Sequence, residues 1–415
     1  MTSHSPDARP VPDVGPAGPA GPAGPLAGIR VVDLSIAATG PYACALLADQ
    51  GAEVIKVERP GIGDLARWVG TSHNGVSALF VNCNRGKRSI AVDIHTSDGV
   101  DIVRRLAAQA DVLVQNYRPG VVDRVGLGYD DLREANPGLV YASLSGFGPV
   151  GPYAGKSAYD TVIQAYAGLA NAQAGPDGRP VFLRQTAADK VTALTASQAI
   201  TAALFARERG AGGQHVELSM LDAVVSFLWI DAAGNEVLMD ADGSMPSSLV
   251  AGFEPMAFAD GWGIATPTSD ADFAGICRAM GVDGYDDPEV ATMVARMTNR
   301  EAVRAIMERV YAAAALLPTE EAMTRLEAER VPCGVLTAPA DLPDDPHALA
   351  MGLFEQHDDP VAGRVRLPRH PARFAATPAD IRGPAPALGQ HTDEILAELG
   401  LADRVAELRA SAAVA

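Results

Sequence analysis

The first half of the chain alternates short runs rich in β-branched residues with longer segments of helical spacing. The runs "GIRVVDLS", "EVIKVERPG", "RSIAVDI", "DVLVQNY" and "GLVYASLSGFG" predict strands, because each is short, apolar and bounded by Gly, Pro or polar residues. Between them, "GPYACALLADQGA" and "SDGVDIVRRLAAQA" have the apolar spacing of helices. This alternation predicts a parallel sheet with helices on both faces and a ligand site at the carboxyl ends of its strands.

The remaining sequence predicts a second, smaller domain. We therefore expect an α/β fold with a Rossmann-like large domain and a smaller α+β domain, joined by long linkers. The expected boundaries are a disordered Pro/Gly/Ala-rich tail over 1–27, the large domain over 28–228, a linker over 229–251, the small domain over 252–341, and a return linker with a C-terminal helix over 342–415.

Charge and composition exclude several classes of partner. The chain has 33 Lys and Arg against 51 Asp and Glu, a formal charge of -18, which disfavours nucleic acid and anionic membranes. No uncharged apolar run approaches the ~20 residues of a membrane span. The four cysteines show no CxxC spacing, so we expect neither a metal site nor a disulfide framework, and a reducing, cytoplasmic location.

The first strand–helix–strand unit raises the question of dinucleotide binding. Glu58 ends the second strand, about where an acid would bind a ribose. The loop "DLSIAATGPYA", however, supplies only Gly40, whereas the dinucleotide fingerprint needs three glycines. A nicotinamide-dependent or binding-only Rossmann protein is therefore the weaker alternative.

A lone acid, Asp160, stands at the head of the uncharged run "TVIQAYAGLANAQAG". The structural interpretation is a helix N-cap whose carboxylate accepts an N–H of the first turn and favours the positive end of the helix dipole. The functional interpretation is a nucleophile that the same position keeps ionised.

Several motifs in order resemble the family III CoA-transferases, which include formyl-CoA and carnitine CoA-transferases and the α-methylacyl-CoA racemases. The motifs are "GPYACALLADQGAEVIKVERPGIGD", "NRGKRSIAVDI", "VLVQNYRPGVVDRVGLGYDDL", "LVYASLSGFGPVGPYAGKSAYDTVIQA" and "PAPALGQHTDEILAELGL". The resemblance runs from about Gly28 to Leu401. It implies two ring-like chains interlocked into a homodimer, with acyl-CoA and a small carboxylic acid as partners.

The resemblance also implies a mechanism. Asp160 matches the family's nucleophile, which forms an aspartyl–acyl anhydride and then an aspartyl-CoA thioester, so that CoA moves from an acyl-CoA donor to a free acid. No metal or tightly bound cofactor is expected. The racemases carry His immediately before this Asp, whereas this chain has Tyr159, whose phenol is a poor general base near neutral pH. Racemisation is therefore disfavoured, although Asp189 matches the racemases' second acid and could equally be an acid in a first helical turn.

The resemblance implies a local basic groove for the phosphates of CoA. Its candidate residues are Arg59, Arg88, Asn116, Tyr117, Arg118 and Arg124. Two departures from formyl-CoA transferase limit the substrate assignment. The loop "SIAATGP" lacks that enzyme's Gln, which makes oxalate a doubtful acceptor. The segment "SSLVAGFEP" stands where that enzyme has a run of glycines that moves over the catalytic Asp, so Gly252 is only a weak candidate for such a gate.

Overall fold

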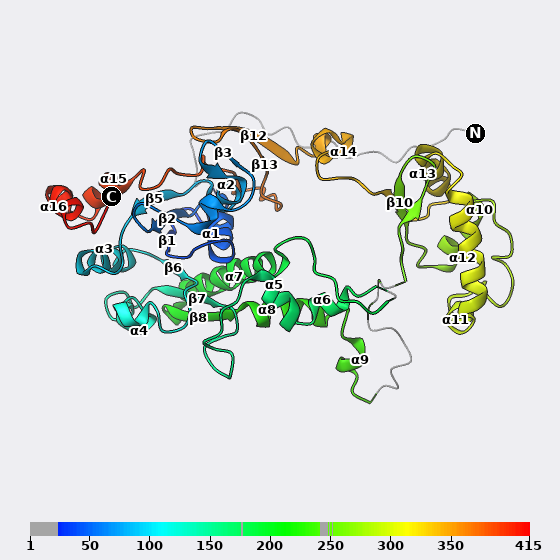
Figure 1. Ribbon diagram of the computed structural model, residues 1–415, viewed down its shortest axis with the longest axis horizontal. Helices are drawn as coiled ribbons and strands as arrows, with labels where there is room; N and C mark the ends of the chain where they lie inside the picture. Colours follow the sequence, from blue (N-terminus) through cyan, green and yellow to red (C-terminus); the bar gives the residue numbers. More distant parts are fainter. Residues whose placement is uncertain (1–23, 176, 241–247, 249, 251) are drawn as a thin grey trace. The chain divides into compact units, whose positions relative to one another are not determined.

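The computed structural model describes residues 24–175, 177–240, 248, 250 and 252–415 (Figure 1). The chain divides into two compact units. The described residues up to Leu228 form one unit together with Gly352–Ala415, and Trp229–Met351 form the other. The first unit is thus built from both ends of the chain.

The centre of the first unit is a six-stranded sheet in the order β5-β2-β1-β6-β7-β8, with every pair of neighbours parallel. Its strands are β1 (Arg30–Asp33), β2 (Glu53–Glu58), β5 (Arg88–Ala91), β6 (Val112–Gln115), β7 (Val140–Ser145) and β8 (Gln214–Ser219). The predicted parallel sheet is confirmed. The strand order reverses between β1 and β6, and in such sheets this is where ligands bind.

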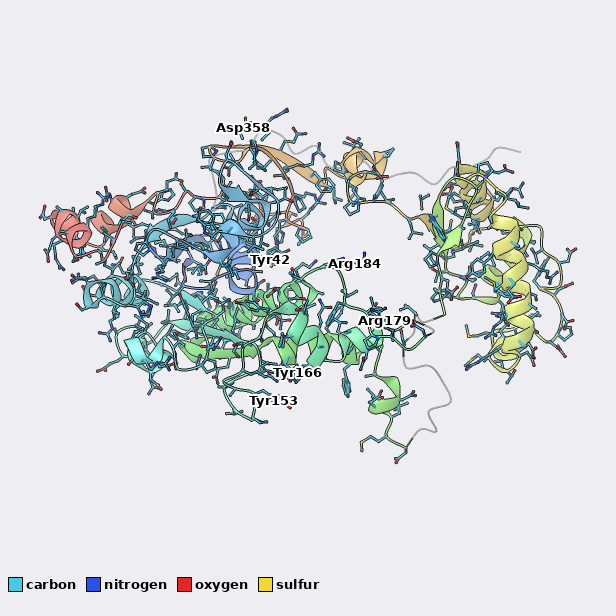
Figure 2. All side chains as sticks on the ribbon, in the orientation of Figure 1. Tyr42, Tyr153, Tyr166, Arg179, Arg184 and Asp358 are labelled. Carbon is cyan, nitrogen blue, oxygen red and sulfur yellow. The ribbon has the colours of Figure 1, made fainter. Side chains whose placement is uncertain are left out.

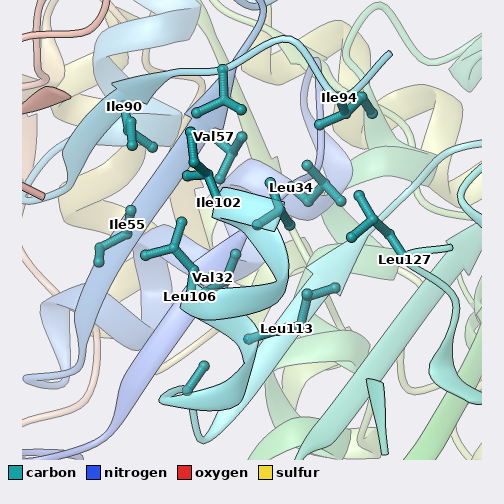
Figure 3. Close-up of a cluster of buried hydrophobic side chains, with 14 of the residues drawn as sticks. Val32, Leu34, Ile55, Val57, Ile90, Ile94, Ile102, Leu106, Leu113 and Leu127 are labelled. Carbon is teal, nitrogen blue, oxygen red and sulfur yellow. The ribbon is translucent and has the colours of Figure 1, made fainter. Parts of the chain in front are cut away.

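Helices cover both faces of the sheet because successive strand residues point to opposite sides. On one face, Val31 lies in a core with α1 (Thr39–Asp49) and α7 (Ala187–Ala206). On the other face, Val32 lies in a core with α3 (Ser97–Ala108), which Figure 3 shows in close-up.

The C-terminal segment completes this second core. Ile395 of α15 (Thr392–Glu398) and Leu408 of α16 (Val405–Ala410) are fully buried in the core that contains Val32. Val414 then pairs with Val92 in an antiparallel bridge just beyond β5. The last helices therefore belong to the hydrophobic core of the first unit.

The last residues of the expected tail contact the first unit. Leu26 is buried in the core beside α1, and its N–H donates to the carbonyl of Gln50 at 2.8 Å. The expected tail was to extend to residue 27, so its last residues are ordered, and residues 1–23 lie outside the described part of the chain.

The return segment holds a structure that the sequence did not reveal. Strands β12 (Phe354–Asp359) and β13 (Gly363–Pro368) form an antiparallel ribbon where an irregular strap was expected. The other elements of the unit are β3 (Ser72–His73), β4 (Val76–Ser77), α2 (Ala78–Asn84), α4 (Tyr129–Leu132), α5 (Asp160–Tyr166), α6 (Leu169–Ala172) and α8 (Met220–Trp229).

The second unit combines a small antiparallel sheet with helices. The sheet has the order β11-β10-β9, and Phe273, Val310 and Leu326 lie in the core beneath it. Its elements are α9 (Gly234–Val237), β9 (Met256–Ala257), β10 (Trp262–Ala265), α10 (Asp270–Ala279), α11 (Met293–Thr298), α12 (Arg300–Ala314), α13 (Thr319–Ala328), β11 (Cys333–Val335) and α14 (Pro346–Ala350). Part of the expected linker and of the segment around Gly252, at 241–247, 249 and 251, lies outside the described residues.

A membrane span is not found in the described residues, because none of their helices is both long and apolar enough to cross a bilayer.

Candidate active site

At the crevice between β1 and β6, the side chain of Asn116 connects the loops that follow the two strands. Asn116, just after β6, accepts a hydrogen bond from the N–H of Ile36 and donates one to its carbonyl, both at 2.8 Å. The same loop contains Ala37, whose φ of +66° is unusual for a residue with a Cβ atom. The loop after β1 is therefore fixed in a strained conformation, as is common at functional sites.

A buried ionic network lies beneath this crevice. Lys87 Nζ is 2.7 Å from Asp33 Oδ2, and Lys56 Nζ is 2.8 Å from Asp64 Oδ2, with all four side chains removed from solvent. Burial alone would raise the pKa of Asp33, but Lys56 and Lys87 outweigh it and lower that pKa to about 2. Both lysines are therefore paired with carboxylates, and these ion pairs stabilise the loop after β1.

Glu58, the acid considered for ribose binding, is occupied as well. Its carboxylate forms two 2.8 Å hydrogen bonds with the guanidinium of Arg67 and accepts a third from Ser89. Such a bidentate, buried pair leaves little capacity for a ribose hydroxyl. This arrangement weakens the nicotinamide alternative further.

Asp160 is the first residue of α5, and it is 7% exposed. The N-cap is Tyr159, so the interpretation of Asp160 as the cap of its own helix is wrong. Its Oδ2 instead accepts a 3.0 Å hydrogen bond from the N–H of Asp189, the third residue of the 20-residue helix α7. A free N–H at the start of a long helix is a favourable partner for a carboxylate, and the first turn of α7 supplies one to Asp160.

Gln164 fixes the other oxygen of Asp160. One turn further along α5, it is fully buried and donates a 2.6 Å hydrogen bond to Asp160 Oδ1. The same amide donates to the carbonyl of Gln185 at 3.1 Å and accepts from the N–H of Leu183 at 3.0 Å. Sequence reasoning missed Gln164, although its i, i+4 spacing from Asp160 places both on one helix face.

Asp189 brings a second carboxyl group next to Asp160. Thr39, the first residue of α1, donates its hydroxyl hydrogen to Asp189 Oδ1. Burial raises the pKa of Asp189 most, Thr39 lowers it and Asp160 raises it, with a net pKa of about 6. The structure thus joins Thr39, Asp189, Asp160 and Gln164 in one hydrogen-bonded chain.

The candidates for the CoA groove divide into two groups. Arg59 follows β2, and Asn116, Tyr117, Arg118 and Arg124 follow β6, so these five lie beyond the carboxyl ends of their strands. The arginines among them are exposed. The guanidinium of Arg118 donates a 2.5 Å hydrogen bond to Ser157 in the loop before Asp160.

Arg88 lies at the opposite end of the sheet. It begins β5, and its guanidinium contacts Glu53 at 2.8 Å, Glu394 at 2.9 Å and Glu398 at 2.7 Å. An arginine neutralised by three glutamates is a poor phosphate ligand. The structure therefore does not bring Arg88 together with the other five candidates.

Aromatic side chains gather in the segment that leads into Asp160. Tyr153 and Tyr166 lie side by side with ring centroids 5.3 Å apart (Figure 2), and Lys156 Nζ lies 4.8 and 4.5 Å from their centroids. Tyr159, by contrast, is 71% exposed. Among the residues that the structure describes, no group of His, Cys, Asp and Glu side chains could hold a metal ion.

An open parallel sheet with a buried, helix-held carboxylate near its crevice defines an α/β enzyme. The model of CoA-transferase family III matches residues 26–392, and the chain therefore belongs to that family and is a CoA-transferase. Similar curated proteins are the succinate–glutarate CoA-transferase of Agrobacterium fabrum, 34% identical over 92% of this chain and 97% of the relative, and the formyl-CoA:oxalate CoA-transferase of Rhodopseudomonas palustris, 32% identical over 94% and 97%.

Similar proteins also occur among solved structures. A CAIB/BAIF family protein from Brucella suis superposes with a TM-score of 0.78 at 33% identity, covering 91% of this chain and 100% of that one. Rv3272 from M. tuberculosis superposes with a TM-score of 0.77 at 30% identity, covering 90% and 99%. The mixed α/β fold with a parallel sheet agrees with these structures.

Proposed function

We propose that Asp160 is the nucleophile of this CoA-transferase. One of its carboxylate oxygens attacks the thioester carbonyl of an acyl-CoA, the C–S bond breaks, and the products are an aspartyl–acyl anhydride and CoA thiolate. The thiolate then attacks the aspartyl carbonyl, releasing the donor acid as a carboxylate and leaving an aspartyl-CoA thioester. The acceptor carboxylate runs these two steps in reverse, so CoA changes hands and no net proton is consumed.

The observation that carries this proposal is the way in which Asp160 is held. Its carboxylate is almost completely buried, yet its partners are the N–H of Asp189 and the amide of Gln164, which are both hydrogen-bond donors. The two donors hold both oxygens of the carboxylate in place, and they suit the anionic form in which a carboxylate acts as a nucleophile. Its shielding also protects an anhydride or thioester from water.

The proposed CoA groove consists of Arg59, Asn116, Tyr117, Arg118 and Arg124. Exposed guanidinium groups beyond the carboxyl ends of β2 and β6 suit phosphates, and the partly buried ring of Tyr117 supplies an apolar wall. Arg88, which is paired with glutamates, is not part of this groove.

A homodimer, interlocked as the family resemblance implies, is the proposed working form. The long helix α7 exposes Leu194 and Phe205, and α8 exposes Phe227 and Trp229. Large apolar side chains exposed on a helix are typical of a surface that another protein covers. The exposed Tyr159, next to the nucleophile, fits an active site that a second chain completes.

The proposed substrates are a succinyl-CoA-like donor and a small dicarboxylic acid, in the cytoplasm. Three of the similar curated proteins have names that contain both succinate or succinyl-CoA and glutarate. Racemisation is the disfavoured alternative, because Tyr159 stands where a racemase needs its His.

Intact-protein mass spectrometry after incubation with succinyl-CoA and other acyl-CoAs tests the proposal. We expect a CoA-sized, hydroxylamine-sensitive adduct on the wild-type protein and none on Asp160→Asn, which keeps the size of the side chain and one of its two acceptor oxygens. Exchange should fall at least about 10³-fold in this variant, while calorimetry still shows CoA binding. An adduct that persists in Asp160→Asn would exclude Asp160 as the nucleophile, and loss of the α-proton of a 2-methylacyl-CoA in heavy water would revive racemisation.

A further inference from the structure

The carboxyl group of Asp189 lies in the wall of a cavity. This cavity, of about 280 Å³, lies wholly within the first unit, and its lining includes Ala38, Tyr42, Cys83, Thr186, Asp189 and Lys190. Asp160 is tied to the same place, because its Oδ2 accepts the N–H of Asp189. A small molecule in this cavity would therefore contact Asp189 close to the proposed nucleophile.

The two oxygens of Asp189 have different surroundings. Oδ1 accepts the hydroxyl hydrogen of Thr39. Oδ2 has no hydrogen-bond partner among the described residues. A carboxyl group held by one oxygen and open at the other is oriented to form a further hydrogen bond through the open oxygen.

Neither cation among the described residues that line this cavity forms an ion pair with Asp189. Lys190, the next residue of α7, donates to Gln185 Oε1 at 2.6 Å, and Arg85, at the end of α2, lies 2.6 Å from Asp49 Oδ2. The remaining titratable groups facing the cavity are the Tyr42 phenol and the Cys83 thiol, and burial raises the pKa of both. Burial contributes most to raising the pKa of Asp189 and Asp160 raises it further, so Asp189 binds its own proton more firmly than an ordinary aspartate does.

We propose that Asp189 is a further catalytic residue, whose protonated carboxyl group donates a hydrogen bond from Oδ2 to the carboxylate of the acid that enters or leaves the Asp160 site. This inference rests on the proposed function. The proton stays on Asp189 throughout the exchange, and no bond to it is broken. Once ionised, Asp189 places a negative charge in the site that the acceptor enters and repels an anionic acceptor.

A protonated Asp189 would lower the electrostatic repulsion that an anionic acceptor meets in the site. The acceptor enters as a carboxylate when Asp160 is a neutral aspartyl-CoA thioester, so the charge of the site at that stage depends on whether Asp189 is ionised, and two like charges at close range are unfavourable in a buried site. A neutral acid at this position supplies a hydrogen bond without adding charge. The acceptor acid should therefore be used best at a pH where Asp189 is protonated.

The test compares the wild type with Asp189→Asn and Asp189→Ala, using succinyl-CoA as donor and glutarate as acceptor. Asparagine keeps the backbone bond to Asp160, can accept from Thr39 and carries a donor that does not titrate. We measure kcat/KM for glutarate from pH 5 to 8.5 and divide the wild-type value by the Asp189→Asn value, which removes the titration of glutarate itself. In parallel, mass spectrometry records the adduct on Asp160.

The ratio should fall about tenfold per pH unit above the pKa of Asp189, which is about 6. Asp189→Asn should retain at least about a tenth of the wild-type activity at pH 6, and Asp189→Ala should lose about 10²-fold. A constant ratio, or one that rises with pH, overturns the inference while the adduct on Asp160 leaves the proposed function intact. Absence of the adduct from the wild type with every donor overturns both.

Discussion

Gln164 Nε2 lies 2.6 Å from Asp160 Oδ1, one turn away on the same helix, and the same amide group holds the main chain of Leu183 and Gln185. Asp160, the proposed nucleophile, and the segment that leads into α7 are thus fixed by one fully buried side chain. Neither partner can move without breaking hydrogen bonds made by the other.

Gln164→Ala should lower both stability and activity. It leaves the N–H of Leu183 and the carbonyl of Gln185 without their partner, which costs about 1–3 kcal/mol of the free energy of unfolding. It also frees Asp160 to rotate, so kcat should fall more than the KM for CoA rises. Urea unfolding and steady-state exchange measure the two effects. The matched control is Thr161→Ala, an exposed position on the same helix, and equal losses in both variants would refute the role of Gln164.

Arg118→Ala and Arg88→Ala should differ in what they change. Removal of Arg118, which lies in the proposed groove, should raise the KM for acyl-CoA about tenfold at low salt and less at high salt, because a phosphate contact is screened. Removal of Arg88 should leave that KM unchanged and lower the melting temperature, because three glutamates lose their partner. The reverse pattern, with Arg88 affecting KM, would place the groove at the other end of the sheet.

Asp33→Asn should destabilise the protein at neutral pH and alter its response to acid. The variant leaves the buried charge of Lys87 without its carboxylate partner, although Pro41 and Asn84 still accept hydrogen bonds from it, at a cost of about 3–5 kcal/mol. Because the folded protein lowers the pKa of Asp33 to about 2, this carboxylate contributes stability above about pH 4, and about 2 kcal/mol is lost as the pH falls toward 2. Urea titrations between pH 2 and 7 should show that acid-dependent loss in the wild type and a smaller one in Asp33→Asn.

Phe205→Glu should break the proposed dimer. Phe205 is 66% exposed near the end of α7, and a carboxylate there cannot be buried against an apolar partner surface. Analytical ultracentrifugation should show monomers, and exchange should be lost at concentrations where the wild type is fully active. Arg105→Glu, a charge change on the exposed side of α3, should leave the dimer intact. A wild type that sediments as a monomer would contradict the expectation directly.

Much of the fold could be predicted, because its signals are local. Each strand of the large sheet is a short β-branched run bounded by Gly or polar residues, as in β2, and the alternation with helices fixes a parallel arrangement. The ribbon of β12 and β13 was missed. Its strands carry charged residues such as Glu355, His357 and Arg366, and the surrounding prolines dominate the pattern.

The site was predicted less completely, because its contacts join residues far apart in the chain. Asp160 was found from its motif, but the helix that holds it is α7 rather than its own, and 29 residues separate Asp160 from Asp189. Thr39 lies 150 residues from the carboxyl group that it contacts. Arg88 was predicted to bind CoA because it lies in a basic sequence segment. The sequence pattern does not show that three glutamates pair with it in the folded chain.

The pairing of Val414 with Val92 has a consequence for how the protein is made. During synthesis, β5 and α3 leave the ribosome long before the segment that completes their core, and the whole second unit is translated in between. The first unit therefore exposes part of its apolar core until the C-terminal helices have been translated. A stop codon only a short distance upstream would release a chain that a cell's proteases and chaperones recognise as unfinished.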